Sequence, residues 1–159
     1  TAALETGILD ATTTPDKTGD TFNFGFVLKD MQGNRVNFDD YKGKVVFLNM
    51  WATWCGPCRA EMPAIQKLYE SVQDPKIAFV MLSIDTDDKK DKVLSYVKKN
   101  NYTFPIFMPS GQLPDQLRVP SIPTTFLISK EGKVILKEVG TTNYNTKKFR
   151  ELLKSEASK

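Results

Sequence analysis

The two cysteines of this chain, Cys55 and Cys58, stand three residues apart, just after a largely apolar run at residues 45–51. The run does not alternate between apolar and polar residues, which is typical of a strand covered on both faces. A helix that begins at the cysteines would place both on one face, with Cβ atoms roughly 5–6 Å apart, close enough for a disulfide. The spacing therefore predicts a strand, a tight turn and a helix that carries a reversible sulfur pair at its start.

The two sulfur atoms are expected to differ in reactivity. At a helix N-terminus, Cys55 faces unpaired backbone N–H groups and the positive end of the helix dipole, which lower the pKa of a thiol. Pro57 suits the first helical turn, where its missing N–H has no partner, and Gly56 leaves the approach to the sulfur open. Cys58 lies one turn further in, and we expect it to be less exposed than Cys55.

Other uses of a Cys-x-x-Cys pair fit this composition poorly. A structural zinc site needs four ligands, and the chain has no histidine and no third cysteine. Covalent haem attachment needs a histidine directly after the second cysteine, where Arg59 stands. No metal is therefore expected. A purely structural disulfide stays open as an alternative, although so short a loop restrains the unfolded chain little.

Size and charge indicate one soluble globular domain. The chain has 159 residues, of which 40% are hydrophobic and 26% charged. Its 22 basic and 19 acidic residues are interspersed, which argues against nucleic-acid binding. No apolar stretch reaches the ~20 residues needed for a transmembrane helix. Because the chain starts at Thr1 rather than Met, we expect a processed or truncated product that has lost a signal peptide or anchor.

The remaining pattern alternates strands and helices. Residues 1–21 are expected to form a flexible arm or tether ahead of a domain at residues 22–159. The predicted elements are a β-hairpin within 22–38, a strand at 45–50, a helix from the cysteines to 72 with a kink at Pro63, a strand at 76–85, a helix at 89–100, a strand at 104–107, a helical turn at 115–117, a hairpin of 124–128 with 133–139, and a helix at 145–155. This order predicts an α/β fold with helices on both faces of the sheet.

Three segments carry a resemblance to a known family: residues 49–63 around the cysteines, residues 119–128 around Pro123, and the helix–strand insert between Asp85 and Ile122. They resemble the thioredoxin-fold family, in particular its TlpA/ResA type of extracytoplasmic thiol–disulfide oxidoreductases. The resemblance implies a thioredoxin-like fold with a central mixed sheet, an N-terminal β-hairpin and this central insert. It also implies a cis peptide bond at Ile122–Pro123 that faces the sulfur pair.

The resemblance further implies the reaction and its setting. Cys55 would attack the disulfide of a protein substrate, Cys58 would resolve the mixed disulfide, and no cofactor would be needed. Gly56–Pro57 and Ile122 resemble the reducing members of the family. These members imply a periplasmic or otherwise extracytoplasmic reductase, recharged by a membrane thiol–disulfide electron donor and acting in c-type cytochrome maturation. A monomer, anchored to the membrane through a removed N-terminal segment, is expected.

Several residues near the two cysteines are expected to assist the reaction or to contact the substrate. Thioredoxins carry a buried Asp six residues before the first cysteine, and Asn49 stands there in this chain. We expect Glu61, one helical turn after Cys58, to accept its proton; the alternative is a solvated glutamate in an early helical turn. Trp51 is assigned to the core, because it continues the buried strand. The residues expected to contact substrate are Trp54, Gly56, Pro57, Ile122 and Pro123.

Two other functions stay open. A thiol peroxidase of the peroxiredoxin type would share the fold and a comparable insert. Peroxiredoxins, however, carry a Thr-x-x-Cys pattern, whereas Thr53 lies only two residues before Cys55. A non-catalytic peptide-binding module would keep the fold without needing intact cysteines. The aromatic residues Tyr102, Phe104 and Phe107 either pack in the core or border a substrate groove.

Overall fold

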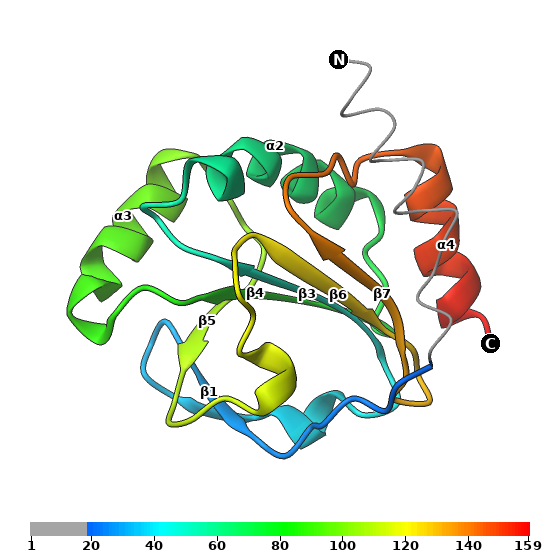
Figure 1. Ribbon diagram of the computed structural model, residues 1–159. Helices are drawn as coiled ribbons and strands as arrows, with labels where there is room; N and C mark the ends of the chain where they lie inside the picture. Colours follow the sequence, from blue (N-terminus) through cyan, green and yellow to red (C-terminus); the bar gives the residue numbers. More distant parts are fainter. Residues whose placement is uncertain (1–18) are drawn as a thin grey trace.

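A seven-stranded mixed sheet forms the centre of the computed structural model, which describes residues 19–159 (Figure 1). The strand order is β2-β1-β5-β4-β3-β6-β7. The strands are β1 (Val27–Asp30), β2 (Arg35–Asn37), β3 (Val45–Trp51), β4 (Ile77–Ser83), β5 (Ile106–Pro109), β6 (Thr124–Ile128) and β7 (Val134–Val139). The helices in these residues are α2 (Gly56–Ser71), α3 (Lys90–Lys99) and α4 (Lys147–Ala157), with the 3-10 helices η1 (Phe38–Tyr41), η2 (Asp87–Lys89) and η3 (Asp115–Leu117).

Strand β3 lies in the interior of the sheet, parallel to β4 on one side and antiparallel to β6 on the other. All seven of its residues are buried, as the apolar run at residues 45–51 predicts. Its side chains alternate between two hydrophobic clusters: Val45, Phe47 and Trp51 face one, and Val46 and Leu48 face the other. The carboxyl end of this doubly covered strand leads directly into the cysteine motif.

The three α-helices pack on one face of the sheet, where residues from α2, α3 and α4 share a single core cluster. Within residues 19–159, the opposite face is covered instead by the Phe-rich segment 22–26, η1 and η3. In Figure 1 α2 and α3 lie above the sheet, α4 lies to its right, and the blue segment before β1 lies below it. Within these residues the α-helices cover one face, and the helices on the other face are the short 3-10 helices η1 and η3. Three phenylalanines of the irregular segment 22–26 bury the rest of that face.

The N-terminal hairpin is confirmed, but its first strand lies later than the phenylalanine alternation indicates. The antiparallel ladder pairs β1 with β2. Phe22, Phe24 and Phe26 precede this ladder, and all three are buried. Thr21 forms an isolated bridge with Lys133, and the Phe22 N–H donates to the Gly132 carbonyl at 2.8 Å. Of the arm predicted at residues 1–21, residues 1–18 lie outside the described residues.

The other predicted elements are present, with ends that differ by a few residues. The strand of the insert shifts by two residues, from 104–107 to Ile106–Pro109, and Phe104 packs in the core ahead of its ladder. The Ile122–Pro123 bond is cis, as the resemblance implies. Across residues 19–159, no helix has the length and hydrophobicity that a membrane span requires.

Candidate active site

Cys55 and Cys58 form a disulfide at the start of α2, with their Cα atoms 5.3 Å apart. Cys55 is the N-cap residue of the helix, and its Sγ accepts a hydrogen bond from the Cys58 backbone N–H at 3.2 Å. Pro57 occupies the first turn, where no N–H is needed. Cys55 keeps 5% of its surface exposed and Cys58 none, so the expected order of exposure is confirmed. The outer sulfur is therefore the one that an incoming group can reach.

A pocket of about 510 Å³ opens beside Cys55. Its lining residues are Trp54, Cys55, Gly56, Pro57, Ile84, Val119, Pro120, Ser121 and Ile122. None of these residues is charged. Four of the five predicted substrate-contacting residues line it, and Trp54 stands out with 64% of its surface exposed. A segment that enters this pocket meets the outer sulfur and a mainly apolar wall.

The loop before β6 forms the second wall of this pocket. The carbonyl oxygen of Ile122 lies 3.8 Å from Cys55 Sγ. Pro123, the fifth predicted contact residue, is buried and is not part of the pocket lining. Pro123 lies beneath the pocket wall, next to Ile122. The backbone of Ile122 is the part of the loop that faces the sulfur.

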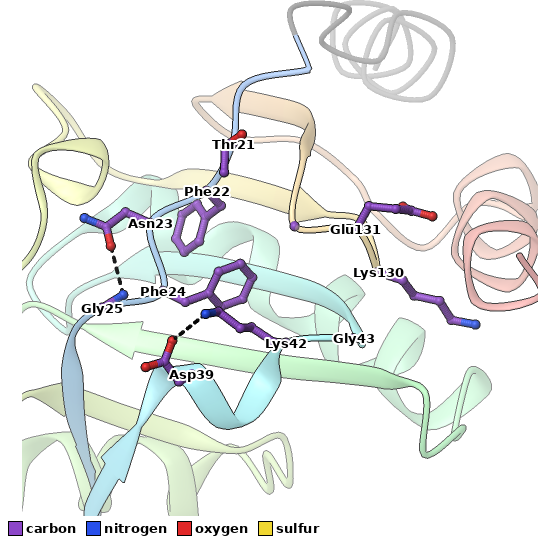
Figure 2. A pocket seen from close by; sticks show the side chains of 11 residues that line it. Thr21, Phe22, Asn23, Phe24, Gly25, Asp39, Lys42, Gly43, Lys130 and Glu131 are labelled. Atoms are coloured by element: carbon purple, nitrogen blue, oxygen red, sulfur yellow. Dashed lines mark hydrogen bonds and ion pairs between the residues drawn. The ribbon is translucent and has the colours of Figure 1, made fainter.

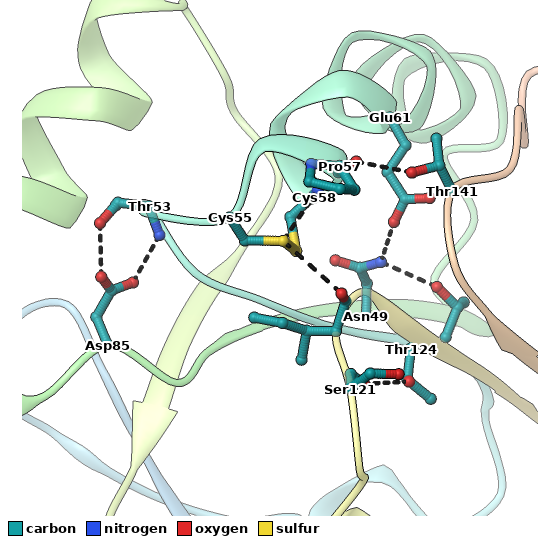
Figure 3. The surroundings of a disulfide bond; sticks show 12 residues. Asn49, Thr53, Cys55, Pro57, Cys58, Glu61, Asp85, Ser121, Thr124 and Thr141 are labelled. Carbon is teal, nitrogen blue, oxygen red and sulfur yellow. Dashed lines mark hydrogen bonds between the residues drawn. A yellow bond between two sulfur atoms is a disulfide. The ribbon is translucent and has the colours of Figure 1, made fainter.

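Glu61 is buried, with 2% of its surface exposed, so its interpretation as a solvated glutamate is wrong. Asn49 Nδ2 donates to its Oε1 at 2.8 Å (Figure 3), and the Thr142 backbone N–H donates to its Oε2 at 3.1 Å. Burial raises the pKa of Glu61 to about 7, against the lowering effect of these two hydrogen bonds. The site thus contains a carboxyl group that gains and loses a proton near neutral pH.

A second pocket, of about 330 Å³, reaches Glu61 from the side of α2 that faces the loop before α4. Lys67, Thr142 and Asn143 are among its lining residues. Thr141 Oγ1 donates to the Pro57 carbonyl at 3.1 Å and so holds this loop against the first turn of α2. This pocket gives water a way to the carboxyl group that does not pass through the groove at Cys55.

The residue that replaces the thioredoxin Asp has a partner that the sequence did not reveal. Asn49 is buried in β3, and its Nδ2 donates to Thr125 Oγ1 on β6 at 2.9 Å as well as to Glu61. Asn49 and Thr125 are register partners on β3 and β6. The sequence signal for this contact was therefore one polar residue within each of two apolar strands. The amide therefore joins the sheet to the acid of α2.

A second polar cluster, also missed from the sequence, lies on the other side of the disulfide from Glu61 in Figure 3. The buried carboxylate of Asp85 accepts hydrogen bonds from the Thr53 backbone N–H at 3.0 Å and from the Thr53 hydroxyl at 2.5 Å. Ser83 Oγ donates to it at 2.6 Å. The sequence signal for this cluster was the polar pair Ser83 and Asp85 at the end of the apolar strand β4.

The remaining aromatic residues are placed by their burial. Trp51 is fully buried in the core, as predicted. Phe104 and Phe107 are also buried, and Tyr102 is partly buried and packs against the same core as Trp51. None of these residues lines the pocket at Cys55. They pack rather than border the groove.

A further pocket, of about 550 Å³, lies between the segment 21–25, the end of η1 and the β6–β7 turn (Figure 2). Phe22 and Phe24 form part of its wall, and an ion pair of 3.1 Å between Lys42 and Asp39 lies across it. It shares no lining residue with the groove at Cys55. In residues 19–159 no group of three or more metal-binding side chains is gathered at either place.

Comparison with known proteins agrees with this geometry. The chain is 38% identical over 116 residues to the thiol-disulfide oxidoreductase ResA of a Bacillus cereus strain, covering 72% of this chain and 66% of the relative, slightly less than two thirds of its length. It is 36% identical over 138 residues to the thioredoxin-like protein YneN of Bacillus subtilis (strain 168), covering 86% of this chain and 75% of the relative.

A solved structure has the same arrangement. It is that of a putative thiol:disulfide interchange protein DsbE from Chlorobium tepidum, with a TM-score of 0.66 and 29% identity, covering 86% of this chain and 94% of that one. The model of the AhpC/TSA family matches residues 19–137, which is most of the chain. The thioredoxin-like fold is therefore established, and this chain belongs to the AhpC/TSA family, among relatives of the ResA type.

Proposed function

We propose that the protein is a thiol–disulfide oxidoreductase that reduces disulfides in other proteins through Cys55 and Cys58. The observation that carries the proposal is the place of Cys55 at the helix N-cap, where its sulfur accepts the Cys58 N–H at 3.2 Å beside an open groove. The same contact stabilises a thiolate, which is the nucleophilic form of the residue. The relatives of the ResA type carry this activity in their names.

The reaction runs in two exchanges. The Cys55 thiolate attacks one sulfur of a substrate disulfide, and the other substrate sulfur leaves as a thiolate and takes up a proton. Cys58 then loses its proton and attacks Cys55 Sγ, which releases the second substrate thiol and forms the Cys55–Cys58 disulfide. Two electrons pass from the dithiol to the substrate, and a separate dithiol donor must restore the pair.

Glu61 is the proton acceptor for Cys58 in this scheme. It lies three residues, about one helical turn, after Cys58. With a pKa of about 7, its carboxylate is present at neutral pH and its acid form is still accessible, as a general base requires. Water in the pocket beside Lys67 and Thr142 carries the proton onward. The groove at Cys55 stays free for the substrate.

The substrates and setting follow from the resemblance. The substrates are disulfide-bearing proteins of a periplasmic or other extracytoplasmic space, with apocytochromes of c-type cytochrome maturation among them. A membrane thiol–disulfide donor recharges the protein, which works as a monomer attached to the membrane by a segment beyond this chain. The mainly apolar lining of the groove suits an extended protein segment better than a charged small molecule.

Trapping with single-cysteine variants tests the two roles. Cys58→Ser cannot resolve the mixed disulfide and should accumulate a covalent complex with a disulfide substrate such as insulin. Cys55→Ser removes the attacking sulfur and should trap nothing. Equal trapping by the two variants would overturn the assignment. The equilibrium constant with glutathione then gives the reduction potential, and a value more oxidising than the glutathione couple would overturn the reductase direction.

Two assays on the unaltered protein distinguish the proposed function from the two alternative functions. A non-catalytic peptide-binding module would bind reduced insulin chains but would not speed insulin reduction by dithiothreitol. In a peroxiredoxin-type peroxidase, hydrogen peroxide would oxidise the Cys55 thiol faster than the disulfides of insulin do. We expect the opposite order of rates, because the groove at Cys55 suits an extended segment.

A further inference from the structure

We infer that Asp85 is a positioning residue: through Thr53 it fixes the Trp54 wall of the groove against the Ile84 wall and so sets how tightly a substrate segment binds. The inference deepens the proposed function and rests on it. Asp85 lies outside the groove lining and hydrogen-bonds to Thr53, so its effect passes through the loop that precedes Cys55.

The contact between Asp85 and Thr53 is bidentate. Thr53 N–H donates to Oδ2 at 3.0 Å and Thr53 Oγ1 donates to Oδ1 at 2.5 Å. Two hydrogen bonds to two oxygens of one carboxylate fix orientation as well as distance. The residues are 32 positions apart in the chain, so this contact joins the end of β3 to the end of β4.

The carboxylate is held in place from its own strand. Asp85 is 4% exposed, and Ser83 Oγ donates to its Oδ2 at 2.6 Å while the Asp85 N–H donates back to Ser83 Oγ at 3.1 Å. All three side-chain and backbone donors to the carboxylate are neutral groups. Burial of a carboxylate costs free energy, and these hydrogen bonds offset part of that cost. They also fix the carboxylate in one orientation toward Thr53.

That geometry is imposed on the groove. Thr53 directly precedes Trp54, and Asp85 directly follows Ile84; Trp54 and Ile84 both line the pocket at Cys55. The Ile84 N–H donates to the Trp51 carbonyl at 2.8 Å, which continues the β3–β4 ladder up to the loop. Beyond that bond, Thr53 and Asp85 supply the connection between the two walls. Figure 3 shows their side chains facing one another next to the disulfide.

Loss of this connection should weaken binding more than it slows chemistry. The sulfur keeps its own support, because Cys58 N–H still caps Cys55 and the Cys55 N–H still donates to the Ala52 carbonyl at 3.1 Å. The same turn bond spans Thr53 and Trp54, but it does not connect the Trp54 wall to the Ile84 wall, which the Asp85–Thr53 contact does. We therefore expect a higher KM for a protein disulfide with kcat nearly unchanged.

The test uses Thr53→Val, which removes only the hydroxyl donor, and Asp85→Asn, which replaces one acceptor oxygen by an amino group. Insulin reduction should show KM raised about three- to tenfold, the cost of one or two lost hydrogen bonds. Thr53→Ser keeps the hydroxyl and should retain the original KM. Ser83→Ala is the comparison variant: it removes a support of the same carboxylate but leaves both Thr53 bonds in place, so it should raise KM less than Thr53→Val does.

A second measurement separates this inference from the proposed function. Amide hydrogen exchange at Thr53 in the oxidised protein should speed up by a similar factor in Thr53→Val and Asp85→Asn, by less in Ser83→Ala, and not at all in Thr53→Ser. If the unaltered protein fails to reduce insulin, the proposed function fails, and the exchange rates alone decide whether Asp85 holds the loop. Equal effects of Ser83→Ala and Thr53→Val, or no effect of Thr53→Val on exchange and KM, would overturn the inference.

Discussion

Asn49 Nδ2 and Glu61 Oε1 are joined by a 2.8 Å hydrogen bond inside the protein, between the central strand and the helix that carries the sulfur pair. The amide donates to the carboxyl group and thus favours its charged form, while burial favours the neutral form. Burial has the larger effect, so the pKa of Glu61 settles at about 7. This balance makes both the stability and the chemistry of the site depend on pH.

Stability should fall as Glu61 ionises. In the unfolded chain the group titrates near its ordinary pKa of 4.5 and in the folded protein near 7. The folded protein binds the proton more tightly, so this contribution is full below pH 4.5 and is lost as the pH rises through 7. Relative to Glu61→Gln, the oxidised protein should lose roughly 2–3 kcal/mol of unfolding free energy between about pH 5 and pH 8. Urea unfolding at several pH values measures this.

Glu70→Gln provides the control for this comparison, because Glu70 lies on the same helix but is exposed. Its pH dependence should match that of the unaltered protein. If Glu61→Gln and Glu70→Gln gave parallel curves, the buried carboxyl group would not be the source of the effect.

Asn49→Asp should make the site more sensitive to alkaline pH. The variant places a second carboxyl group within hydrogen-bond distance of Glu61, and two carboxylates this close hold one proton between them. We expect a loss of about 1–3 kcal/mol at pH 8 compared with pH 5, beyond that of the unaltered protein. The double variant Asn49→Asp with Glu61→Gln should remove this excess, and additive behaviour of the two changes would contradict the coupling.

Phe38→Ala should be one of the most destabilising single changes in the chain. Phe38 is fully buried on the face of the sheet opposite α2, α3 and α4, and its ring stacks on Phe26 with centroids 4.5 Å apart. Truncation of such a ring costs about 3–5 kcal/mol. Phe38→Leu retains most of the volume and should cost less than half as much. A small loss for the alanine variant would mean that this aromatic cluster contributes little, and thermal unfolding decides between the outcomes.

The elements near the cysteines could be predicted from the sequence because their signals are local. An unbroken apolar run gives a doubly covered strand, and a cysteine pair with proline in between gives the first turn of a helix. Cys55, Cys58 and the groove residues Trp54 and Ile122 follow from these signals together with the resemblance.

The polar contacts could not be predicted in the same way. Asn49 meets Glu61 across 12 residues, and Thr53 meets Asp85 across 32, so each contact depends on how one element packs on another. The placement of α2, α3 and α4 on one face likewise depends on tertiary packing, since Phe22, Phe24 and Phe26 help to cover the other face without forming a regular element. Periodicity shows that an element has an apolar side but not which face of the sheet it covers.

Gln66→Leu should detach the loop before β5 from α2. Gln66 is 8% exposed; its Oε1 accepts the Thr103 and Phe104 N–H groups at 2.9 and 3.3 Å, and its Nε2 donates to Thr103 Oγ1 at 2.6 Å. Leucine leaves the N–H of the buried Phe104 without this acceptor, at a cost of about 1–3 kcal/mol, whereas Thr103 is exposed and its N–H can turn to water. Gln66→Glu keeps the acceptor and lets the Thr103 hydroxyl donate in turn, so it should destabilise less. Hydrogen exchange at Thr103 and Phe104 should accelerate in the leucine variant alone, and equal exchange in both variants would show that this side chain does not hold the loop.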